Sequence, residues 1–297
     1  MARIVECVPN FSEGRREEVI QALAETIRTT DGVRLLDVQA DSSHNRCVLS
    51  FVGDLEAVRA AALAAAGRAV ELIDMNRHRG EHPRLGAVDV IPLVPVAGLS
   101  MEECVAAAHA LGREIWERLR VPVYFYAEAA TRAERRRLPD IRKGEYEGLK
   151  GKLAEPAWAP DVGDPVAHPT AGVTVVGARR PLIAYNINLT TADVEVARRI
   201  ARAVRESTGG LVNVQAMGVK AASGQAQVSM NLLDHTRTPV HRAFELVRVE
   251  AARHGADILE SEIVGLIPLD AVADVARFYL RLRGFDRAQI LEAKLME

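Results

Sequence analysis

The chain has 297 residues, of which 48 % are hydrophobic, 26 % are charged and only 4 % are aromatic. This length favours two domains whose cores consist mainly of aliphatic side chains. The 38 basic and 40 acidic residues nearly balance, which argues against a nucleic-acid-binding protein, because such proteins present strongly basic surfaces.

The cysteines and the first residues indicate where the protein resides. Cys7, Cys47 and Cys104 are odd in number and widely spaced, so they suit neither a disulfide framework nor a CxxC metal site. Residues 1–18 lack the apolar stretch of a signal peptide. No apolar run approaches the roughly 20 residues needed to cross a bilayer. We therefore expect a cytoplasmic protein that does not bind membranes.

Hydrophobic spacing predicts the elements of the first half of the chain. The expected strands are residues 4–9, 33–38, 47–52, 87–96 and 121–126. The expected helices are residues 12–28, 58–72 and 101–118, where apolar side chains recur every three or four positions. The strand at 87–96 contains Pro92 and Pro95, which predicts an edge strand or an irregular one.

The second half repeats this order of elements. Strands are expected at residues 182–189, 211–217, 226–233 and 258–263, with helices after the first and the third of them. Both halves therefore read strand, helix, strand, strand, helix, strand, which is the order of ferredoxin-like folds. The sequence predicts an α/β (α+β) protein of two ferredoxin-like βαββαβ-type lobes with mixed sheets. A single doubly wound sheet is the alternative.

The two halves are joined by a long segment, residues 145–180, which is rich in proline and glycine. Loops of this length in compact proteins are usually functional or disordered. Because the segment also contains Trp158, Val162 and Val166, we expect it to be ordered and to contact a ligand. We place the boundary near Ala178, with lobes at 1–178 and 179–297. The basic run at 132–137 is interpreted as a solvated face.

The sharpest polar cluster is HRGEHPR at residues 78–84. HRGEH matches the H-x-x-E-H pattern of inverzincin zinc sites, but that pattern needs a helix, and Gly80 and Pro83 argue against one here. The other functional reading is proton transfer by His82, with Glu81 and Arg84 orienting a substrate or adjusting the pKa of His82. On composition alone, a charged surface loop without function is favoured.

Several long motifs resemble those of one known family. They are ECVPNFSEG (6–14), LIDMNRHRGEHPRLGAVDV (72–90), VPVYFYAEAA (121–130), LPDIRKGEYEGL (138–149), WAPDVG (158–163) and GARRPLIAYNINL (177–189). QVSMNLLD (227–234) and EIVGLIPLDA (262–271) agree more loosely. The chain resembles the formiminotransferase domain of formiminotransferase-cyclodeaminase and its stand-alone bacterial relatives, over essentially its whole length. The cyclodeaminase half has no counterpart in the chain.

The resemblance implies a function and a set of site residues. It implies transfer of a formimino group between N-formimino-L-glutamate and N5 of tetrahydrofolate, in histidine degradation and one-carbon metabolism. Tetrahydrofolate would be a co-substrate held in a cleft between the lobes, with no metal, and the protein would be a homodimer. The catalytic histidine falls on His82. The folate-contacting segment falls on Gly163, Asp164, Pro165, Val166, Ala167, His168, Pro169, Thr170, Ala171 and Gly172.

Further polar residues are candidates for binding the substrate. Arg46, within the motif SHNR, suits a substrate carboxylate, although it could also be a surface charge of a hairpin loop. Asn10 could contact substrate or close a turn. Asn186 and Asn188 alternate on a strand and share a face that could line the cleft. The full set is Asn10, Asp41, Arg46, Glu81, Arg84, Asn186 and Asn188.

One departure from the family pattern affects the acid–base assignment. Family members have an acidic residue shortly after LLDV, where this chain has Gln39, and Asp41 could replace it. Two other functions remain open: a transferase or cyclo-ligase that uses 5-formyltetrahydrofolate, and a folate-binding module without turnover. A nucleotide requirement would indicate the ligase, although no P-loop motif is visible.

Overall fold

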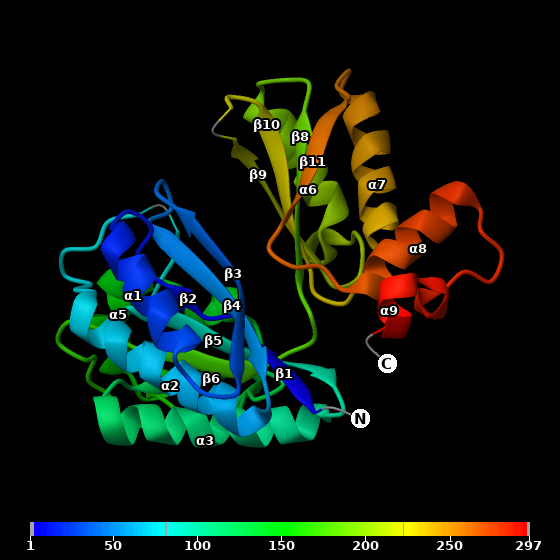
Figure 1. Cartoon of the computed structure of the whole chain (residues 1–297). Helices are drawn as coiled ribbons and strands as arrows, with labels where there is room; N and C mark the ends of the chain where they lie inside the picture. Colours follow the sequence, from blue (N-terminus) through cyan, green and yellow to red (C-terminus); the bar gives the residue numbers. More distant parts are fainter. Residues whose placement is uncertain (1–2, 81, 222, 296–297) are drawn as a thin grey trace. The chain divides into compact units, whose positions relative to one another are not determined.

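The computed structural model describes residues 3–80, 82–221 and 223–295 (Figure 1). The chain divides into two compact units, Met1–Arg179 and Arg180–Glu297, each with its own hydrophobic core. The predicted two-lobed α/β architecture is confirmed. No helix within the described ranges is long and apolar enough to span a membrane.

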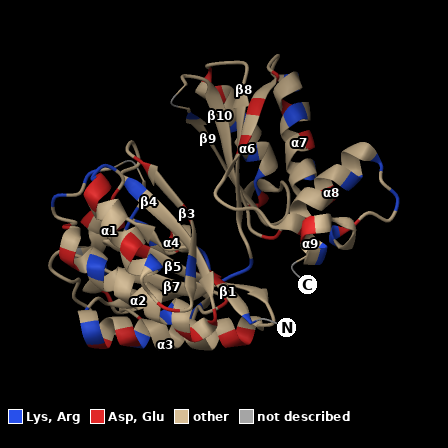
Figure 2. Cartoon of the chain, in the orientation of Figure 1, with Lys and Arg blue, Asp and Glu red and all other residues tan. Residues whose placement is uncertain are grey.

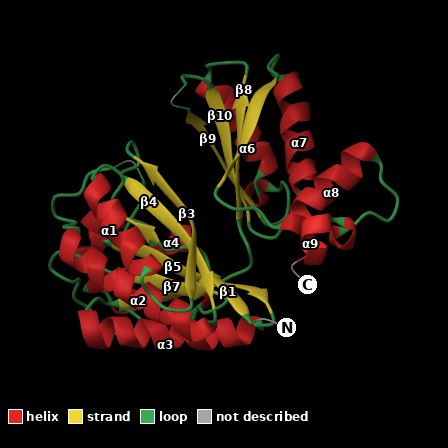
Figure 3. Cartoon of the chain, in the orientation of Figure 1, coloured by secondary structure: helices red, strands yellow, loops and turns green. Residues whose placement is uncertain are grey.

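The first unit is a ferredoxin-like sheet extended on one side (Figure 3). Its strands are β1 (Ile4–Cys7), β2 (Asn10–Phe11), β3 (Val33–Asp41), β4 (Arg46–Gly53), β5 (Val88–Ala97), β6 (Val123–Ala127) and β7 (Thr174–Ala178). Its α-helices are α1 (Glu17–Arg28), α2 (Leu55–Leu72), α3 (Met101–Leu119), α4 (Leu138–Ile141) and α5 (Glu145–Leu153). β5, β1, β4 and β3 pair antiparallel in that order, and β7 and β6 continue the sheet as parallel strands.

Helices α1, α2 and α3 cover one face of this sheet and form the larger core with it. Alternate residues of β4, such as Cys47 and Leu49, point into that core and are fully buried. Acidic and basic residues are mixed along α3 (Figure 2), as expected for a helix with one apolar stripe and one solvated face.

The other face of the sheet carries the polar residues singled out in the sequence. Asp41 pairs with Arg46 across β3 and β4, Gln39 pairs with Val48, and Asn10 of β2 pairs with Val48 from the other side. Residues that pair directly across antiparallel strands share a face, and so do residues two apart along a strand. Asn10, Gln39, Asp41 and Arg46 therefore lie together, on the face opposite the main core.

The strand with two prolines is interior to the sheet, so the expectation of an edge strand is wrong. β5 lies between β1 and β2 on one side and β7 on the other. The expected irregularity is present, because the β1–β5 register shifts opposite Pro95. That shift lets proline stand in an interior strand without leaving a regular ladder position unpaired.

The second unit contains a second ferredoxin-like sheet, formed by β8 (Ile183–Leu189), β9 (Val214–Lys220), β10 (Ala226–Leu232) and β11 (Ile258–Val264). Its helices are α6 (Val194–Val204), α7 (Val240–Arg253), α8 (Leu269–Leu280) and α9 (Leu291–Leu295). The strand order is β11-β8-β10-β9, and every pair is antiparallel. The expectation of a mixed sheet therefore holds for the first unit only, where β6 and β7 add parallel pairs.

The segment at 145–180 is ordered, but it is more regular than predicted. It contains α5, a 3₁₀ turn at Pro156–Trp158 and the buried strand β7. The sequence reading missed β7 because TVVGA is buried on both sides and so lacks the alternation of a half-exposed strand. α4 and α5 pack on the second face of the sheet, where Ile141, Leu149 and Leu153 form a smaller core.

The basic run at 132–137 is not wholly solvated, which corrects the sequence interpretation. Arg135 is 3 % exposed and forms an ion pair with Asp161, 5 % exposed, at 2.8 Å. Asp161 also accepts a hydrogen bond from the backbone N–H of Phe125 at 2.9 Å. This pair ties the segment that precedes residues 163–172 to the end of β6, and it explains the aspartate of the WAPDVG motif structurally.

We predict that Asp161→Asn destabilises the protein by about 3–5 kcal/mol, because it leaves the buried Arg135 charge without its partner. Glu128→Gln is the matched control, since the Glu128–Arg136 pair is more than half exposed on both sides and should contribute at most about 1 kcal/mol. Urea unfolding measures both variants. Equal, small losses would contradict a structural role for the Arg135–Asp161 pair.

Candidate active site

His82 lies on an irregular loop, residues 73–87, between α2 and β5. Apart from an isolated bridge at Gly86, the described part of this loop has no helix or strand, so its shape depends on hydrogen bonds from side chains and neighbouring segments. Three neighbours supply them: the turn between β3 and β4, the start of α5, and residues 168–173.

Asn45, in the β3–β4 turn, connects three segments of the chain. It has a left-handed backbone (φ 49°), which asparagine tolerates better than most residues. Its Oδ1 accepts from the N–H of Gly14 and its Nδ2 donates to the carbonyl of Arg79, both at 2.9 Å. Its own carbonyl lies 2.9 Å from Nε2 of His78. Every polar group of the Asn45 side chain is thus used to hold the loop.

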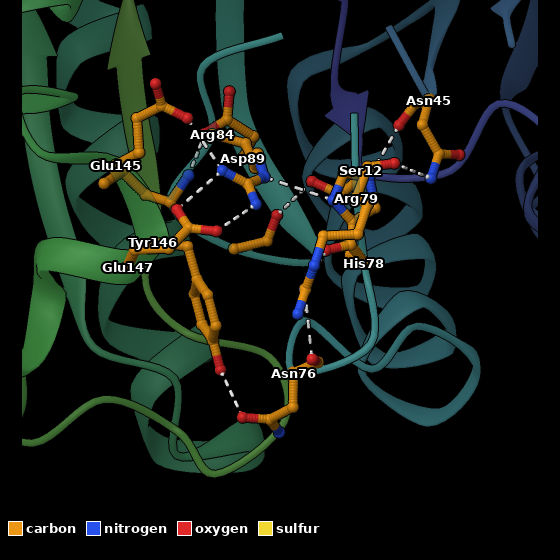
Figure 4. A network of polar contacts seen from close by, with 12 residues as sticks. Ser12, Asn45, Asn76, His78, Arg79, Arg84, Asp89, Glu145, Tyr146 and Glu147 are labelled. Carbon is orange, nitrogen blue, oxygen red and sulfur yellow. Dashed lines mark hydrogen bonds and ion pairs between the residues drawn. The ribbon is translucent and has the colours of Figure 1, made fainter. Parts of the chain in front are cut away.

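Arg84 holds the other end of the loop to α5, as Figure 4 shows. Its side chain is 5 % exposed, and its Nη1 and Nη2 donate to Glu145 at 2.8 Å and to Glu147 at 2.6 Å. Its Nε donates to Nδ1 of His78 at 3.2 Å. The guanidinium is therefore engaged within the protein, and the substrate-binding role expected for Arg84 remains a prediction.

The geometry of the H-x-x-E-H residues does not suit a zinc site. The described residues of this segment, 78–80 and 82, are not helical, so the two histidines do not share a helix face. Nε2 of His78 faces the Asn45 carbonyl and Nδ1 accepts from Arg84, so both ring nitrogens have protein partners. Burial lowers the pKa of His78, in agreement with a neutral ring. Among the described residues, no group of three or more His, Cys, Asp or Glu could hold a metal ion.

Two glycines allow this loop to approach its neighbours closely. A Cβ on Gly80 would stand 2.3 Å from the carbonyl oxygen of His44, and one on Gly86 would stand 2.1 Å from that of Val173. Both positions therefore exclude a side chain for steric reasons. The glycine that argued against a helix is the residue that lets the loop pack against the β3–β4 turn.

His82 is in direct contact with Arg46. Nη1 of Arg46 lies 2.9 Å from Nε2 of the imidazole. A guanidinium only donates, so Nε2 must accept, and the ring is neutral with its proton on Nδ1. The ring of His44 lies 6.2 Å away, edge-on. Among the expected substrate-binding residues that the structure describes, Arg46 makes a side-chain hydrogen bond to His82.

Electrostatics keep His82 neutral. Burial, followed by the positive charges of Arg46 and Arg142 and smaller effects of His44 and Arg84, lowers the pKa of His82 to about 2. The free protein therefore holds an imidazole that can accept a proton only weakly. Compensating a nearby positive charge would raise this pKa and make the ring a stronger base.

Arg142, at the end of α4, was not predicted from the sequence as a site residue. It forms an ion pair with Asp89, which is 2 % exposed and accepts from the N–H of Leu85 at 2.8 Å. Asp89 thus links the end of the His82 loop to Arg142. The available signal was the LPDIRKGEYEGL motif, which contains Arg142, but nothing in its spacing indicates proximity to His82.

The predicted folate segment, 163–172, lies beside the His82 loop. The N–H of Met75 donates to the carbonyl of Thr170 at 2.8 Å, and the N–H of Ala87 donates to that of Ala171 at 2.9 Å. His168 closes the tight turn before Gly172, and its Nδ1 accepts from the N–H of Ala171 at 3.0 Å. Val166 is 70 % exposed, so this turn presents an apolar side chain to solvent.

The remaining candidates in the first unit have local partners. Nδ2 of Asn10 donates to the carbonyl of Val8 at 3.2 Å, which closes the turn before β2. Asp41 accepts from the N–H groups of Ser43 and His44 and lies 2.6 Å from Nδ1 of His44. Glu81 lies outside the described residues.

In the second unit, Asn186 and Asn188 share the face of β8 opposite its core, as predicted. Asn186 donates to Glu262 at 3.0 Å and Asn188 donates to Glu260 at 3.1 Å. Gln227 also donates to Asn188 at 2.9 Å. This face is therefore polar and internally hydrogen-bonded, and its part in ligand binding stays a prediction, as does a ligand cleft between the lobes.

The first unit thus combines a half-buried neutral histidine, two arginines and an adjoining segment, residues 163–172, with an exposed apolar side chain. A neutral histidine can transfer a proton, and arginines can bind an anionic substrate. Residues 4–179 match the family profile described as the formiminotransferase domain, N-terminal subdomain, and residues 184–294 match the formiminotransferase domain. The chain belongs to the formiminotransferase family.

Curated relatives agree with this assignment. The chain is 46 % identical to a glutamate formimidoyltransferase of Streptococcus pyogenes, with all of both chains covered. It is 48 % identical to the Thermoplasma acidophilum protein of the same name, covering 98 % of this chain and 97 % of the relative. It is 52 % identical to the formimidoyltransferase-cyclodeaminase of Gallus gallus over 95 % of its own length, but spans only 53 % of that relative.

We predict that Gly80→Ala reduces stability and displaces the His82 loop, because the added Cβ would collide with the carbonyl of His44. The loss should be about 1–3 kcal/mol, the usual cost of overpacking. Gly148→Ala on α5 is the control: a Cβ there meets nothing within 4 Å, and alanine should be neutral or slightly stabilising. Thermal unfolding of both variants measures this difference. A Gly80→Ala protein with the stability of the wild type would contradict the close approach of Gly80 to His44.

Proposed function

We propose that the chain is a glutamate formimidoyltransferase, which moves the formimino group between N-formimino-L-glutamate and N5 of tetrahydrofolate. Full-length relatives at 46 % and 48 % identity carry this name. The observation that carries the proposal is the neutral, half-buried His82 on its glycine-dependent loop, in contact with Arg46. A neutral imidazole is suited to accept and return one proton.

The reaction needs one proton to move between two nitrogens. N5 of tetrahydrofolate attacks the amidine carbon, so that an N5–carbon bond forms and a tetrahedral intermediate results. The bond from this carbon to the α-nitrogen of glutamate then breaks. His82 takes the proton that N5 loses and gives it to the departing nitrogen, so atoms and charge balance. Holding both substrates in one site makes the attack effectively unimolecular.

Tetrahydrofolate is the co-substrate in this proposal, and residues 163–172 contact it. Two features support this. The segment is hydrogen-bonded to the His82 loop through Met75 and Ala87, so a ligand on it would lie close to the histidine. The exposed Val166 offers an apolar surface of the kind that an aromatic ligand covers. Acid–base chemistry by His82 makes a metal unnecessary for the reaction.

Two finer properties remain proposals based on the family resemblance. They are a cytoplasmic location and a homodimeric state. Sedimentation analysis of the purified chain tests the second directly.

We predict that the wild-type protein converts formiminoglutamate and tetrahydrofolate to glutamate and the formimino-folate without nucleotide. His82→Gln should lower kcat by roughly 10² to 10⁴, the usual contribution of a positioned acid–base group. His254→Gln is the control, since His254 is exposed at the end of α7 and should retain full activity. No turnover by the wild type would reject the function, and near-normal kcat in His82→Gln would remove this histidine from the mechanism.

A further inference from the structure

The free protein holds His82 in a form that cannot yet act as the base. Its Nε2 lone pair is occupied by Nη1 of Arg46 at 2.9 Å, and Nδ1 then carries the ring proton. No ring nitrogen is available to a substrate until Arg46 donates elsewhere. Something that binds Arg46 more strongly than an imidazole does must therefore arrive with the substrate.

Two arginines whose charges act on His82, Arg46 and Arg142, each have a buried N–H group without the partner that buried donors normally have. Nε of Arg46 and Nε of Arg142 are both buried, and neither has a hydrogen-bond partner among the described residues. Buried donors without partners are costly and uncommon in native proteins. Arg46 contacts His82 through Nη1, and Arg142 contacts Asp89, which is tied to the end of the His82 loop, so an acceptor for these N–H groups would lie close to the histidine.

The charges at this site also lack full compensation. Asp89 pairs with Arg142, but Arg46 forms no ion pair within the described part of the chain. Asp41, which pairs with Arg46 across the strands, is engaged with His44. Arg142 lies close enough to lower the pKa of both Arg46 and His82. Among the residues that the structure describes, positive charge is therefore in excess next to the imidazole.

We propose that Arg46 and Arg142 bind the α-carboxylate of the amino-acid substrate, and that this carboxylate draws the Arg46 donor away from Nε2 of His82. The inference rests on the proposed function and deepens it, since it assigns a substrate-binding pair and a trigger to the same site. A carboxylate supplies the acceptor that both unpartnered Nε–H groups need, and arginine binds it with charge-assisted hydrogen bonds.

The chemistry of the substrate selects the α-carboxylate over the γ-carboxylate. The nitrogen that leaves during transfer and the α-carboxylate are attached to the same carbon. The base that serves this nitrogen and the arginine that binds this carboxylate must therefore be neighbours, as His82 and Arg46 are. The γ-carboxylate lies two further carbon atoms along the side chain and would reach a different part of the site.

The pKa of His82 should depend on whether the substrate carboxylate is bound to Arg46. The charges that face His82 are Arg46 on β4, His44 in the β3–β4 turn, Arg84 on the loop and Arg142 after α4. Neutralising Arg46 removes the largest of the charge effects that lower the pKa of His82, so this pKa rises when the carboxylate binds. Binding should then take up a proton from solution as the pH falls below neutrality.

The test uses N-formyl-L-glutamate, a substrate analogue with an amide that does not titrate, in calorimetry between pH 5 and pH 7. Buffers of different ionisation enthalpy report proton uptake. N-formyl-L-2-aminobutyrate keeps only the α-carboxylate, and 4-formamidobutyrate keeps only the γ-carboxylate. We expect proton uptake, increasing towards pH 5, with the first two ligands, and no uptake with at least about tenfold weaker binding for the third.

Matched variants separate binding from the trigger. Arg46→Gln should bind N-formyl-L-glutamate at least about tenfold more weakly and without proton uptake. Arg142→Lys keeps the charge beside Asp89 but loses the Nε donor, so it should fold and bind about tenfold more weakly. His82→Gln should still bind but take up no proton. Arg68→Gln on α2 removes an exposed arginine that pairs with Glu71 and should match the wild type.

Two results would overturn the inference: wild-type binding without proton uptake from pH 5 to pH 7, or undiminished binding by Arg46→Gln. Failure of the proposed function is a separate outcome. Formiminoglutamate could fail to turn over while N-formyl-L-glutamate binds with proton uptake that depends on Arg46. In that case the carboxylate site is supported and the reaction assignment is wrong. If turnover occurs but Arg46→Gln binds N-formyl-L-glutamate with the affinity and proton uptake of the wild type, the reaction assignment is supported and the proposed carboxylate site is wrong.

Discussion

The position of the site residues depends on how a loop without regular secondary structure keeps one shape. Backbone groups of such a loop need partners, and Asn45 provides them for Arg79 and Gly14 while its carbonyl faces His78. Arg84 continues the same network from His78 to the two carboxylates of α5. A buried polar network of this kind specifies one arrangement when its members are satisfied. The position of His82 follows from it.

The second consequence is electrostatic. Fixing His82 next to Arg46 places a titratable ring among positive charges and away from water, and both effects favour the neutral form. A neutral base is required to begin a proton transfer from N5, but one so weakly basic would be slow. The structure resolves this conflict if the positive charge is cancelled by the substrate itself. Positive charge in the free site and negative charge on the substrate then become parts of one mechanism.

The sequence predicted much of the fold. The repeated element order identified two ferredoxin-like sheets, because apolar periodicity records which side chains face a core. It could not identify β7, whose residues are buried on both faces and show no alternation. The sequence also suggested that β5 could be an edge strand. It could not show that the pairing of β5 with β1 shifts register at Pro95, because that shift depends on both strands.

The candidate site could be predicted only in part, for a similar reason. His82 and Arg46 stand in motifs, but their contact joins residues on β4 and on a distant loop, and local spacing carries no information on it. Arg84 stands in the same motif as His82, but its pairing with Glu145 and Glu147 of α5 could not be read from the sequence. Arg135, in a run that looked solvated, is buried against Asp161. In each case a tertiary partner, rather than the residue type, decides the role.

The central claim is that the free protein holds His82 neutral, with Nε2 accepting from Arg46. Nitrogen-15 NMR of histidine-labelled protein without ligand tests this most directly, with His82→Gln used to assign the signal. The account predicts a proton on Nδ1, an unprotonated Nε2 and no titration of His82 between pH 5 and pH 8. A ring that carries its proton on Nε2, or that titrates near the ordinary histidine value of about 6.5, would contradict it.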